Sequence, residues 1–327
     1  MAVTIRDIAR TAGVSISTVS KVLNGHDAAI SDATRSRIHA AVKELDYRPN
    51  MVARGLRARS TRSIGFVLPD ITNPFFPAIA RGIEDCAQKR GFTVIFCDTD
   101  DDSSRERESI RDLNDKMVDG MIVTHALKMG LEGLNECRVP TVVVDRCSRE
   151  EVLGVGFVFS DMRAATQVIT EHLIERGCER LAFVTAHRDV APDRFQGFID
   201  ALDSHDRVPD FDLIFEGGYD VETGERGVGK LLQSGSFDAI VCGNDLIAIG
   251  ALRALRCHGL KVPEDVRVVG IDDIYIARYL EPALTTVYQP AYEMGQAAAR
   301  MLIDCLVKGT PLYSQELPFE LRIRQSA

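Results

Sequence analysis

The chain has 327 residues, which is too long for one compact domain of ordinary size and predicts two or three domains. Hydrophobic residues make up 45% and charged residues 27%, and no apolar run approaches the length of a membrane span, which excludes a membrane protein. The first ten residues carry charges where a signal peptide has its apolar region, which predicts a cytoplasmic protein. The 8 cysteines are scattered without a C-x-x-C pair, so neither a zinc site nor a redox pair is indicated. No metal and no cofactor are expected.

The net charge of −9 is unevenly distributed along the chain. Residues 1–62 contain 11 Lys and Arg against 5 acidic residues and carry +6, whereas the rest contains 28 against 43 and carries −15. A polyanion would repel the acidic body. Only the basic N-terminal segment is therefore expected to meet one.

The N-terminal segment has the pattern of three short helices. Thr4 and Asp7 can form a capping box at the first helix, and Gly13 can end it. Ser15 can then cap a second helix, ISTVSKVLN, and Ser31 can start a third that completes a small core. Two short helices joined by a tight turn predict a helix-turn-helix.

The second helix offers a polar face to a partner. With Val19 and Val22 in the core, Ser17 and Lys21 point away from it. In a DNA-binding helix-turn-helix this face enters the major groove, where a lysine can donate to the O6 and N7 atoms of guanine. The alternative is an ordinary three-helix bundle with a solvated face, and the charge of +6 favours DNA binding.

A short basic segment, NMVARGLRARSTR, follows the third helix. Asn50 can cap a helix there, but nine residues that include Gly55 are too few to hold a helix alone in water. Composition leaves two interpretations open: a helix that forms only when something orders it, and a flexible linker.

From Ser63 onward, apolar runs alternate with amphipathic ones, which predicts an α/β fold of parallel sheets covered by helices. Ten strand candidates suggest two sheets, in two similar lobes that divide near residue 162 and are rejoined by a helix over 292–307. The candidates are residues 64–68, 92–98, 120–124, 141–146, 156–161, 181–185, 212–218, 239–244, 266–272 and 285–289.

Such folds host many enzymes, but no catalytic motif is complete in this sequence. No G-x-G-x-x-G follows a strand, and no metalloprotease, hydrolase or kinase motif occurs. The segment GERGVGKL, residues 224–231, matches the start of a phosphate-binding loop, yet Leu231 stands where Ser or Thr should bind magnesium. An enzyme is therefore not predicted.

Polar residues follow several strands at their carboxyl ends, where ligands of open α/β sheets bind. Their donors and acceptors suit a ligand with several hydroxyl groups. These residues are Asn73, Asp145, Arg146, Asn244, Asp272 and Gln289.

Five segments together resemble the LacI/GalR family of bacterial transcription repressors: TIRDIARTAGVSISTVSKVLN, RPNMVARGLRARSTRSIGFVLPDITNPFF, DRFQGF, CGNDLIAIGALRAL and VVGIDDIYIARYLEPALTTVYQP. The resemblance implies an all-α helix-turn-helix over 1–48, a hinge helix over 49–62 and a two-lobed core over 63–327 related to periplasmic sugar-binding proteins. The N-lobe would comprise about 63–162 and 291–327, and the C-lobe about 163–290. It also implies a homodimer on double-stranded, pseudo-palindromic operator DNA.

The resemblance implies DNA contacts in the head and the hinge. Leu56 matches the leucine that wedges into the minor groove and kinks the duplex. Two departures are a loop before the third helix that is about one residue longer than usual, and Gly55, which predicts a weaker hinge. The implied DNA-binding residues are Thr4, Ile16, Ser17, Thr18, Lys21, Ala53, Arg54 and Leu56.

The core resembles the bacterial ribose-binding protein at the residues that surround the pentose. Aromatic rings would stack on the sugar while polar groups bind its hydroxyls. The single change is aromatic for aromatic, at Tyr219. The implied effector-binding residues are Asn73, Phe75, Phe76, Asp145, Arg146, Arg194, Tyr219, Asn244, Asp272 and Gln289.

The expected function is that of a repressor controlled by a small sugar, with ribose or a similar pentose acting as inducer. A hexose or a ribonucleoside is the alternative effector, the latter because Arg188 matches a base-contacting arginine of a relative. A sugar-metabolising enzyme is the remote alternative.

Overall fold

The computed structural model describes residues 3–23, 25, 27–47, 60–126, 130–146, 152, 154–189 and 192–327. The chain divides into two compact units, Met1–Thr61 and Arg62–Ala327. This division lies one residue before the expected start of the core. The predicted hinge contacts Ala53, Arg54 and Leu56 lie outside the described residues.

Three helices form the first unit: α1 (Ile5–Ala12), α2 (Ile16–Leu23) and α3 (Asp32–Glu44). Their core is centred on Ile8, Val19 and Ile38, each fully buried. The predicted helix-turn-helix pattern is confirmed in this unit.

The predicted caps of these helices are confirmed. The Asp7 carboxylate accepts hydrogen bonds from the backbone N–H of Thr4 at 3.0 Å and from its hydroxyl at 2.7 Å. Gly13 ends α1 at φ +65°, a conformation that glycine adopts without strain. Ser15 and Ser31 accept from the backbone N–H groups of the third residue after each.

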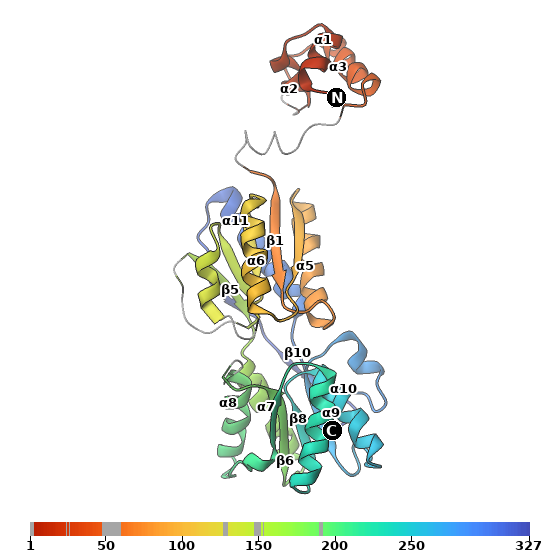
Figure 1. Cartoon of the computed structure of the whole chain (residues 1–327), viewed down its shortest axis with the longest axis vertical. Helices are drawn as coiled ribbons and strands as arrows, with labels where there is room; N and C mark the ends of the chain where they lie inside the picture. Colours follow the sequence, from red (N-terminus) through yellow and green to blue (C-terminus); the bar gives the residue numbers. More distant parts are fainter. Residues whose placement is uncertain are drawn as a thin grey trace. The chain divides into compact units, whose positions relative to one another are not determined.

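The N-lobe of the second unit is a sheet of order β11-β5-β4-β3-β1-β2, with every neighbouring pair parallel. Figure 1 shows α5, α6 and α11 around β1. The elements are β1 (Ser63–Leu68), α5 (Phe75–Lys89), β2 (Thr93–Asp98), α6 (Ser103–Asp115), β3 (Gly120–Val123), η1 (Gly130–Glu136), β4 (Thr141–Val144), β5 (Val155–Phe159), α11 (Ala291–Lys308) and β11 (Ser314–Glu316).

The C-lobe is a sheet of order β12-β10-β9-β8-β6-β7, parallel except for β12. Figure 1 shows α7 to α10 around it. The elements are α7 (Met162–Glu175), β6 (Leu181–Ala186), α8 (Pro192–Asp203), η2 (Phe211–Leu213), β7 (Ile214–Gly217), α9 (Val221–Ser234), β8 (Ala239–Cys242), α10 (Asp245–Cys257), β9 (Arg267–Asp272), η3 (Tyr275–Tyr279), β10 (Thr285–Tyr288) and β12 (Glu320–Arg322).

All ten predicted strands are present, and β11 and β12 are additional. The expectation that residues 291–327 belong wholly to the N-lobe is wrong for their last part, because β12 pairs with β10 of the C-lobe. The chain end is fixed there as well. Ser326 donates to the Val268 carbonyl at 2.6 Å and accepts from the Thr285 N–H at 2.8 Å.

Glycines let the helices of each lobe approach closely. A Cβ on Gly82 of α5 would come within 2.1 Å of a backbone oxygen of α11, and one on Gly224 of α9 within 2.0 Å of a backbone oxygen of α10. The segment GERGVGKL lies within helix α9 rather than in a phosphate-binding loop, and Gly224 of this segment serves helix packing.

Among the described residues, no helix combines the length and the apolar character that crossing a membrane would require.

Candidate DNA-contacting surface and ligand site

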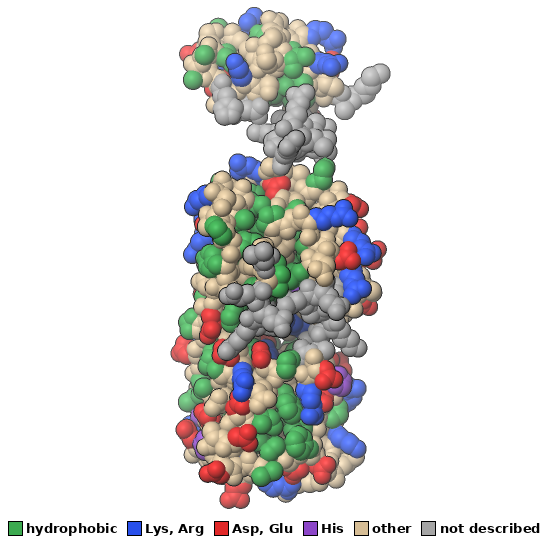
Figure 2. Space-filling model, turned by 90° about the vertical axis from the view of Figure 1, so that its left-hand side faces the viewer, with side chains coloured by type: hydrophobic (Ala, Val, Ile, Leu, Met, Phe, Trp, Pro, Cys, Tyr) green, Lys and Arg blue, Asp and Glu red, His purple; other side chains and the backbone are tan. Residues whose placement is uncertain are grey.

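Helix α2 presents to solvent the face that the sequence predicts. Ser17 and Lys21 are exposed and Ile16 is 42% exposed, whereas Val19 and Val22 are buried. Thr18 is partly buried and Thr4 is exposed. The five predicted DNA contacts of this unit are therefore at least partly accessible, and Figure 2 shows Lys and Arg side chains on the visible face of the same unit.

Hydroxyl groups are already ordered at the start of α2. The Ser15 hydroxyl is hydrogen-bonded to the hydroxyls of Ser17 at 2.8 Å and of Thr18 at 2.7 Å. A partner therefore meets hydroxyls in fixed positions, which lowers the entropy lost on binding.

The loop before α3 is held by Arg35. Its Nε donates to Asp27 Oδ2 at 2.5 Å, and its Nη1 pairs with Asp32. Two carboxylates thus balance this guanidinium, and the Asp27 contact ties the loop to α3.

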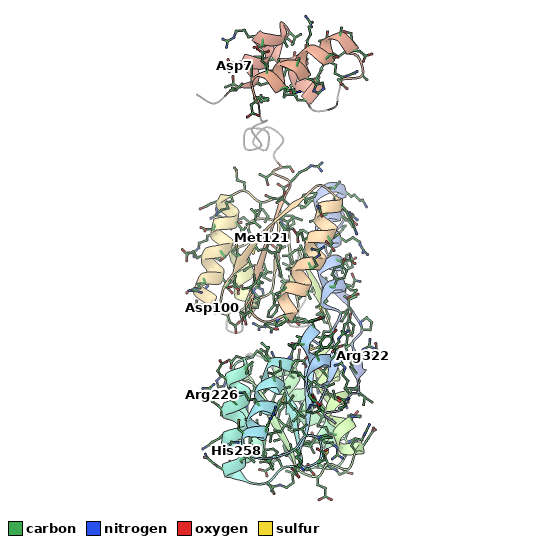
Figure 3. All side chains as sticks on the ribbon, turned by 90° about the vertical axis from the view of Figure 1, so that its right-hand side faces the viewer. Asp7, Asp100, Met121, Arg226, His258 and Arg322 are labelled. Carbon is green, nitrogen blue, oxygen red and sulfur yellow. The ribbon has the colours of Figure 1, made fainter. Side chains whose placement is uncertain are left out.

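The predicted ligand residues come from the facing ends of the two lobes. Five follow β1 or β4 in the N-lobe or open α5 there: Asn73, Phe75, Phe76, Asp145 and Arg146. Five lie in the C-lobe, on α8 or at the ends of β7, β8, β9 and β10: Arg194, Tyr219, Asn244, Asp272 and Gln289. All are buried except the partly buried Arg146 and Tyr219. Asp100, at the end of the N-lobe that faces the C-lobe in Figure 3, marks this edge.

The N-lobe side carries the paired rings. Phe75 and Phe76 are both buried, with ring centroids 5.4 Å apart and planes at 77°. The Asn73 carbonyl oxygen Oδ1 accepts from the Phe75 N–H at 3.1 Å, which fixes the start of α5. This bond uses the carbonyl oxygen, so the amide nitrogen of the same side chain can donate to a further group.

Arg146 contacts aromatic rings of both lobes. Its Cζ lies 5.3 Å from the ring centre of Phe76 and 5.6 Å from that of Tyr219, within the range of cation–π attraction. Its Nη1 donates to Asp101 Oδ1 at 2.7 Å and to the His125 carbonyl at 3.2 Å. The guanidinium is thus oriented by the N-lobe and contacts an aromatic ring of the C-lobe.

Arg194 is a buried cation with several partners. It donates to the Gly243 carbonyl, its Nη2 lies 3.5 Å from Asp272 Oδ1, and its Cζ lies 4.9 Å from the Tyr219 ring centre. Burial acts to lower the pKa of Arg194, but the neighbouring Tyr219 and Asp272 outweigh it and raise that pKa. Arg194 therefore stays charged.

Asp272 is held in an environment that disfavours its charge. Burial raises the pKa of Asp272 to about 7, Asp145 adds to the increase, and Arg194 opposes it. Gln289 Nε2 donates to Asp272 Oδ1 at 2.7 Å. The carboxyl group can therefore change protonation near neutral pH when its surroundings change.

Four buried side-chain atoms at these strand ends have no hydrogen-bond partner among the described residues. Buried polar atoms in native proteins are nearly always paired with protein, water or ligand. A polyhydroxylated ligand would supply such partners at the same edge of the sheets. The atoms are Thr124 Oγ1, His125 Nε2, Thr185 Oγ1 and Gln289 Oε1.

Sequence reasoning missed Asp245, which lies beside Asn244. Asn244 Oδ1 caps α10 through the Ile247 N–H at 2.9 Å. Asp245 is fully buried and accepts from the Thr286 hydroxyl at 2.6 Å and the Ile274 N–H at 2.8 Å, and burial holds its pKa well above the usual range. An acidic residue directly after an apolar strand was the available signal.

Asp101 and His125, the partners of Arg146, were also missed. Asp101 follows β2 in the acidic run DTDDD, and His125 follows β3. Both sit at strand ends, so extending the strand-end rule to every polar residue there would have included them.

This set of groups offers apolar ring faces and charged hydrogen-bond donors, the chemistry by which small polar ligands are bound. Among the described residues, no group of acidic, histidine and cysteine side chains could hold a metal ion. Arg188 is the residue that suggested a ribonucleoside as an alternative effector. It donates to Glu216 Oε1 at 2.8 Å, and its Cζ lies 4.4 Å from the centre of the Phe195 ring.

Comparison with known proteins relates both units to one family. Residues 4–50 match the model of bacterial regulatory proteins of the lacI family, and residues 170–327 match a periplasmic binding protein-like domain. A ribose operon repressor of Halalkalibacterium halodurans is 35% identical over 99% of this chain and 96% of its own length.

Two solved structures are similar to this chain. The lac repressor dimer bound to operator and the anti-inducer ONPF has a TM-score of 0.89 at 26% identity, covering 100% of this chain and 99% of that one. A LacI family transcriptional regulator from Enterococcus faecium with bound ribose has a TM-score of 0.72 at 30% identity, covering 81% of this chain and 98% of that one. With its helix-turn-helix and its two-lobed core, this chain belongs to the lacI family of bacterial transcriptional regulators.

Proposed function

We propose that this protein is a repressor whose affinity for operator DNA is lowered by ribose or a similar pentose. The observation that carries the proposal is the convergence of two aromatic rings in edge-to-face contact, two guanidinium groups and a buried carboxyl at the facing ends of the lobes. Such a site presents apolar faces to a sugar ring and donors and acceptors to its hydroxyls. The similar protein named a ribose operon repressor and the neighbour with bound ribose support the choice of sugar.

The mechanism is a population shift between lobe arrangements. Arg146 and Tyr219 belong to different lobes, so a sugar that binds between them binds one lobe arrangement more tightly than others. That preference changes the fraction of dimers that have the lobe arrangement in which both DNA-binding units can bind the operator. Coupling energies of this kind are about 1–3 kcal/mol, or roughly 5- to 150-fold in DNA affinity.

The DNA contacts fall to α2 and to the hinge. Lys21 and Ser17 would read base edges, Ile16 would add an apolar contact, and Thr18 and Thr4 would bind phosphates or sugars of the backbone. Ala53, Arg54 and Leu56 would meet the minor groove at the centre of the operator.

A homodimer is the assembly that fits these contacts. Exposed apolar side chains stand on η3 and on the edge strand β2: Tyr275, Ile276, Tyr279 and Phe96. Tyr275 and Tyr279 are in ring contact at 5.1 Å. Burying these surfaces against a second copy would remove them from water, and a dimer matches a pseudo-palindromic operator.

The protein would act in the cytoplasm, where its DNA is, and by binding without turnover. Free pentose is favoured over a ribonucleoside because Glu216 and Phe195 already engage the Arg188 guanidinium. A hexose remains the second candidate within the same site.

Two measurements on the purified full chain test the proposal. Calorimetric titration with ribose, uridine and several hexoses should show the tightest binding for ribose. Fluorescence anisotropy with labelled operator should then show release when ribose is added. If uridine or a hexose binds more tightly than ribose, that compound is the effector instead. If ribose strengthens DNA binding, it acts as a corepressor and not as an inducer.

A further inference from the structure

A carboxylate and an imidazole are buried together in the N-lobe, outside the predicted set of ligand residues. Glu106 of α6 is 0% exposed and His125, after β3, is 2% exposed. Glu106 Oε1 lies 2.6 Å from His125 Nδ1, and Glu106 Oε2 accepts from the Ala126 N–H at 2.6 Å. Both carboxylate oxygens therefore bind one short segment, residues 125–126.

Stability alone does not explain this pair. Burying a carboxylate costs several kcal/mol even when it is paired, and apolar replacements of buried ion pairs are often no less stable. His125 Nε2 is also buried without a hydrogen-bond partner among the described residues, which costs about 1–3 kcal/mol more. Groups that are this costly to bury are often part of a functional site.

The pair is one peptide group away from the ligand site. The carbonyl of His125 and the N–H of Ala126 belong to the same planar trans peptide, so they point in opposite directions. By binding the N–H, Glu106 turns the carbonyl away from itself, and that carbonyl accepts from Arg146 Nη1 at 3.2 Å. Asp101 Oδ1 accepts from the same nitrogen at 2.7 Å.

We propose that Glu106 and His125 are positioning residues that set the orientation of Arg146 in the ligand site. The inference rests on the proposed sugar-binding function. Two acceptors on Nη1 hold the guanidinium within cation–π distance of the rings of Phe76 and Tyr219. An ionised Glu106 would accept from Nδ1 and so place the imidazole proton of His125 on that nitrogen.

The test uses a matched pair of variants in two backgrounds. Glu106→Gln keeps an acceptor for the Ala126 N–H, whereas Glu106→Met has nearly the same shape and no acceptor. We expect Glu106→Met to weaken ribose binding about tenfold and Glu106→Gln to restore it to within about threefold of wild type. In an Arg146→Met background, Glu106→Met should change the affinity less than about twofold, because the group it acts through is gone.

Equal losses from Glu106→Met in both backgrounds, or equal losses from the Met and Gln variants, would overturn the inference. If Glu106→Met does not fold, His125→Asn and His125→Leu replace the pair, since the asparagine amide can occupy the position of Nδ1 and leucine cannot. His258→Leu is the matched control, because His258 lies on the surface of the C-lobe at the end of α10, as Figure 3 shows, and should leave binding unchanged.

A second readout separates this inference from the proposed function. If the wild-type protein binds no sugar in calorimetry, the proposed function fails. The positioning role is then decided by the NMR resonance of the Arg146 Nε–H group, which should shift in Glu106→Met and return in Glu106→Gln. A resonance that stays in place in both variants overturns the positioning role.

Discussion

Replacing Asp272 with asparagine should raise the stability of the free protein at alkaline pH and weaken its sugar binding. The carboxyl is buried between Arg194, Asp145 and Gln289, and its pKa is raised from the usual 3.8 to about 7. A shift of about 3 units corresponds to about 4 kcal/mol of preference for the neutral form. An amide of the same shape is neutral at every pH.

The pH dependence follows from this direction of the shift. A pKa that is higher in the folded than in the unfolded state stabilises the fold below the unfolded value, and that contribution is lost as the pH rises through the folded value. The wild-type protein should therefore lose up to about 4 kcal/mol between about pH 4 and pH 8 through this group, and Asp272→Asn should not. Urea unfolding of both proteins at pH 5 and pH 8 measures the difference.

The affinity for the sugar should rise with pH, whereas the stability of the free protein falls. A hydroxyl that donates to Asp272 favours the ionised carboxylate, so the affinity of the wild-type protein should rise with pH up to about 7 and then level off. The variant should bind weakly with little dependence on pH. Glu264→Gln, at an exposed site, is the control. Parallel stability curves for wild type and Asp272→Asn would refute the assignment of this protonation to Asp272.

Three further predictions concern packing and DNA contacts. Gly224→Ala should lower the free energy of unfolding by at least about 1–3 kcal/mol, measured by thermal unfolding, because a Cβ would contact α10. Gly229→Ala in the same helix, where a Cβ has nothing within 4 Å, should be neutral or stabilising. Equal effects of the two variants would contradict the packing role. Ser326→Ala should cost about 1–3 kcal/mol, because two buried backbone groups lose their partner, and a smaller loss in urea unfolding would show that water replaces it. Lys21→Ala should relax base preference at one base pair per half-site by about 1–3 kcal/mol, and uniform weakening in a binding-site selection assay would indicate phosphate contact instead.

Local signals explain why most of the fold could be predicted. The ten long strands are apolar runs bounded by turns, and the caps at Thr4 and Ser31 depend only on residues three positions away. The strands β11 and β12 have three residues each and half of those are charged, so no pattern distinguishes them from loop. Only pairing with β5 and β10 makes them strands.

The site was predictable to the extent that the strand-end rule and family resemblance apply. Both point to polar residues at the carboxyl ends of strands, such as Asn73 and Gln289. Glu106 lies on a helix whose sequence is mostly charged, and nothing local shows that it alone among those charges is buried with a histidine. That information arises only when α6 packs against the sheet and Glu106 meets residues 125–126, which follow β3.

The last residues of the chain add one strand to the sheet of each lobe, and this has a consequence during synthesis. The sheet of the N-lobe lacks its last strand until β11 has been synthesised, and that of the C-lobe lacks its own until β12 has followed. During translation both β5 and β10 therefore expose an open edge, the kind of surface that pairs with other chains. The DNA-binding unit, complete after about the first sixty residues, can fold well before either lobe closes. A substitution that slows release or folding of the last twenty residues would therefore favour aggregation of a chain whose head is already native.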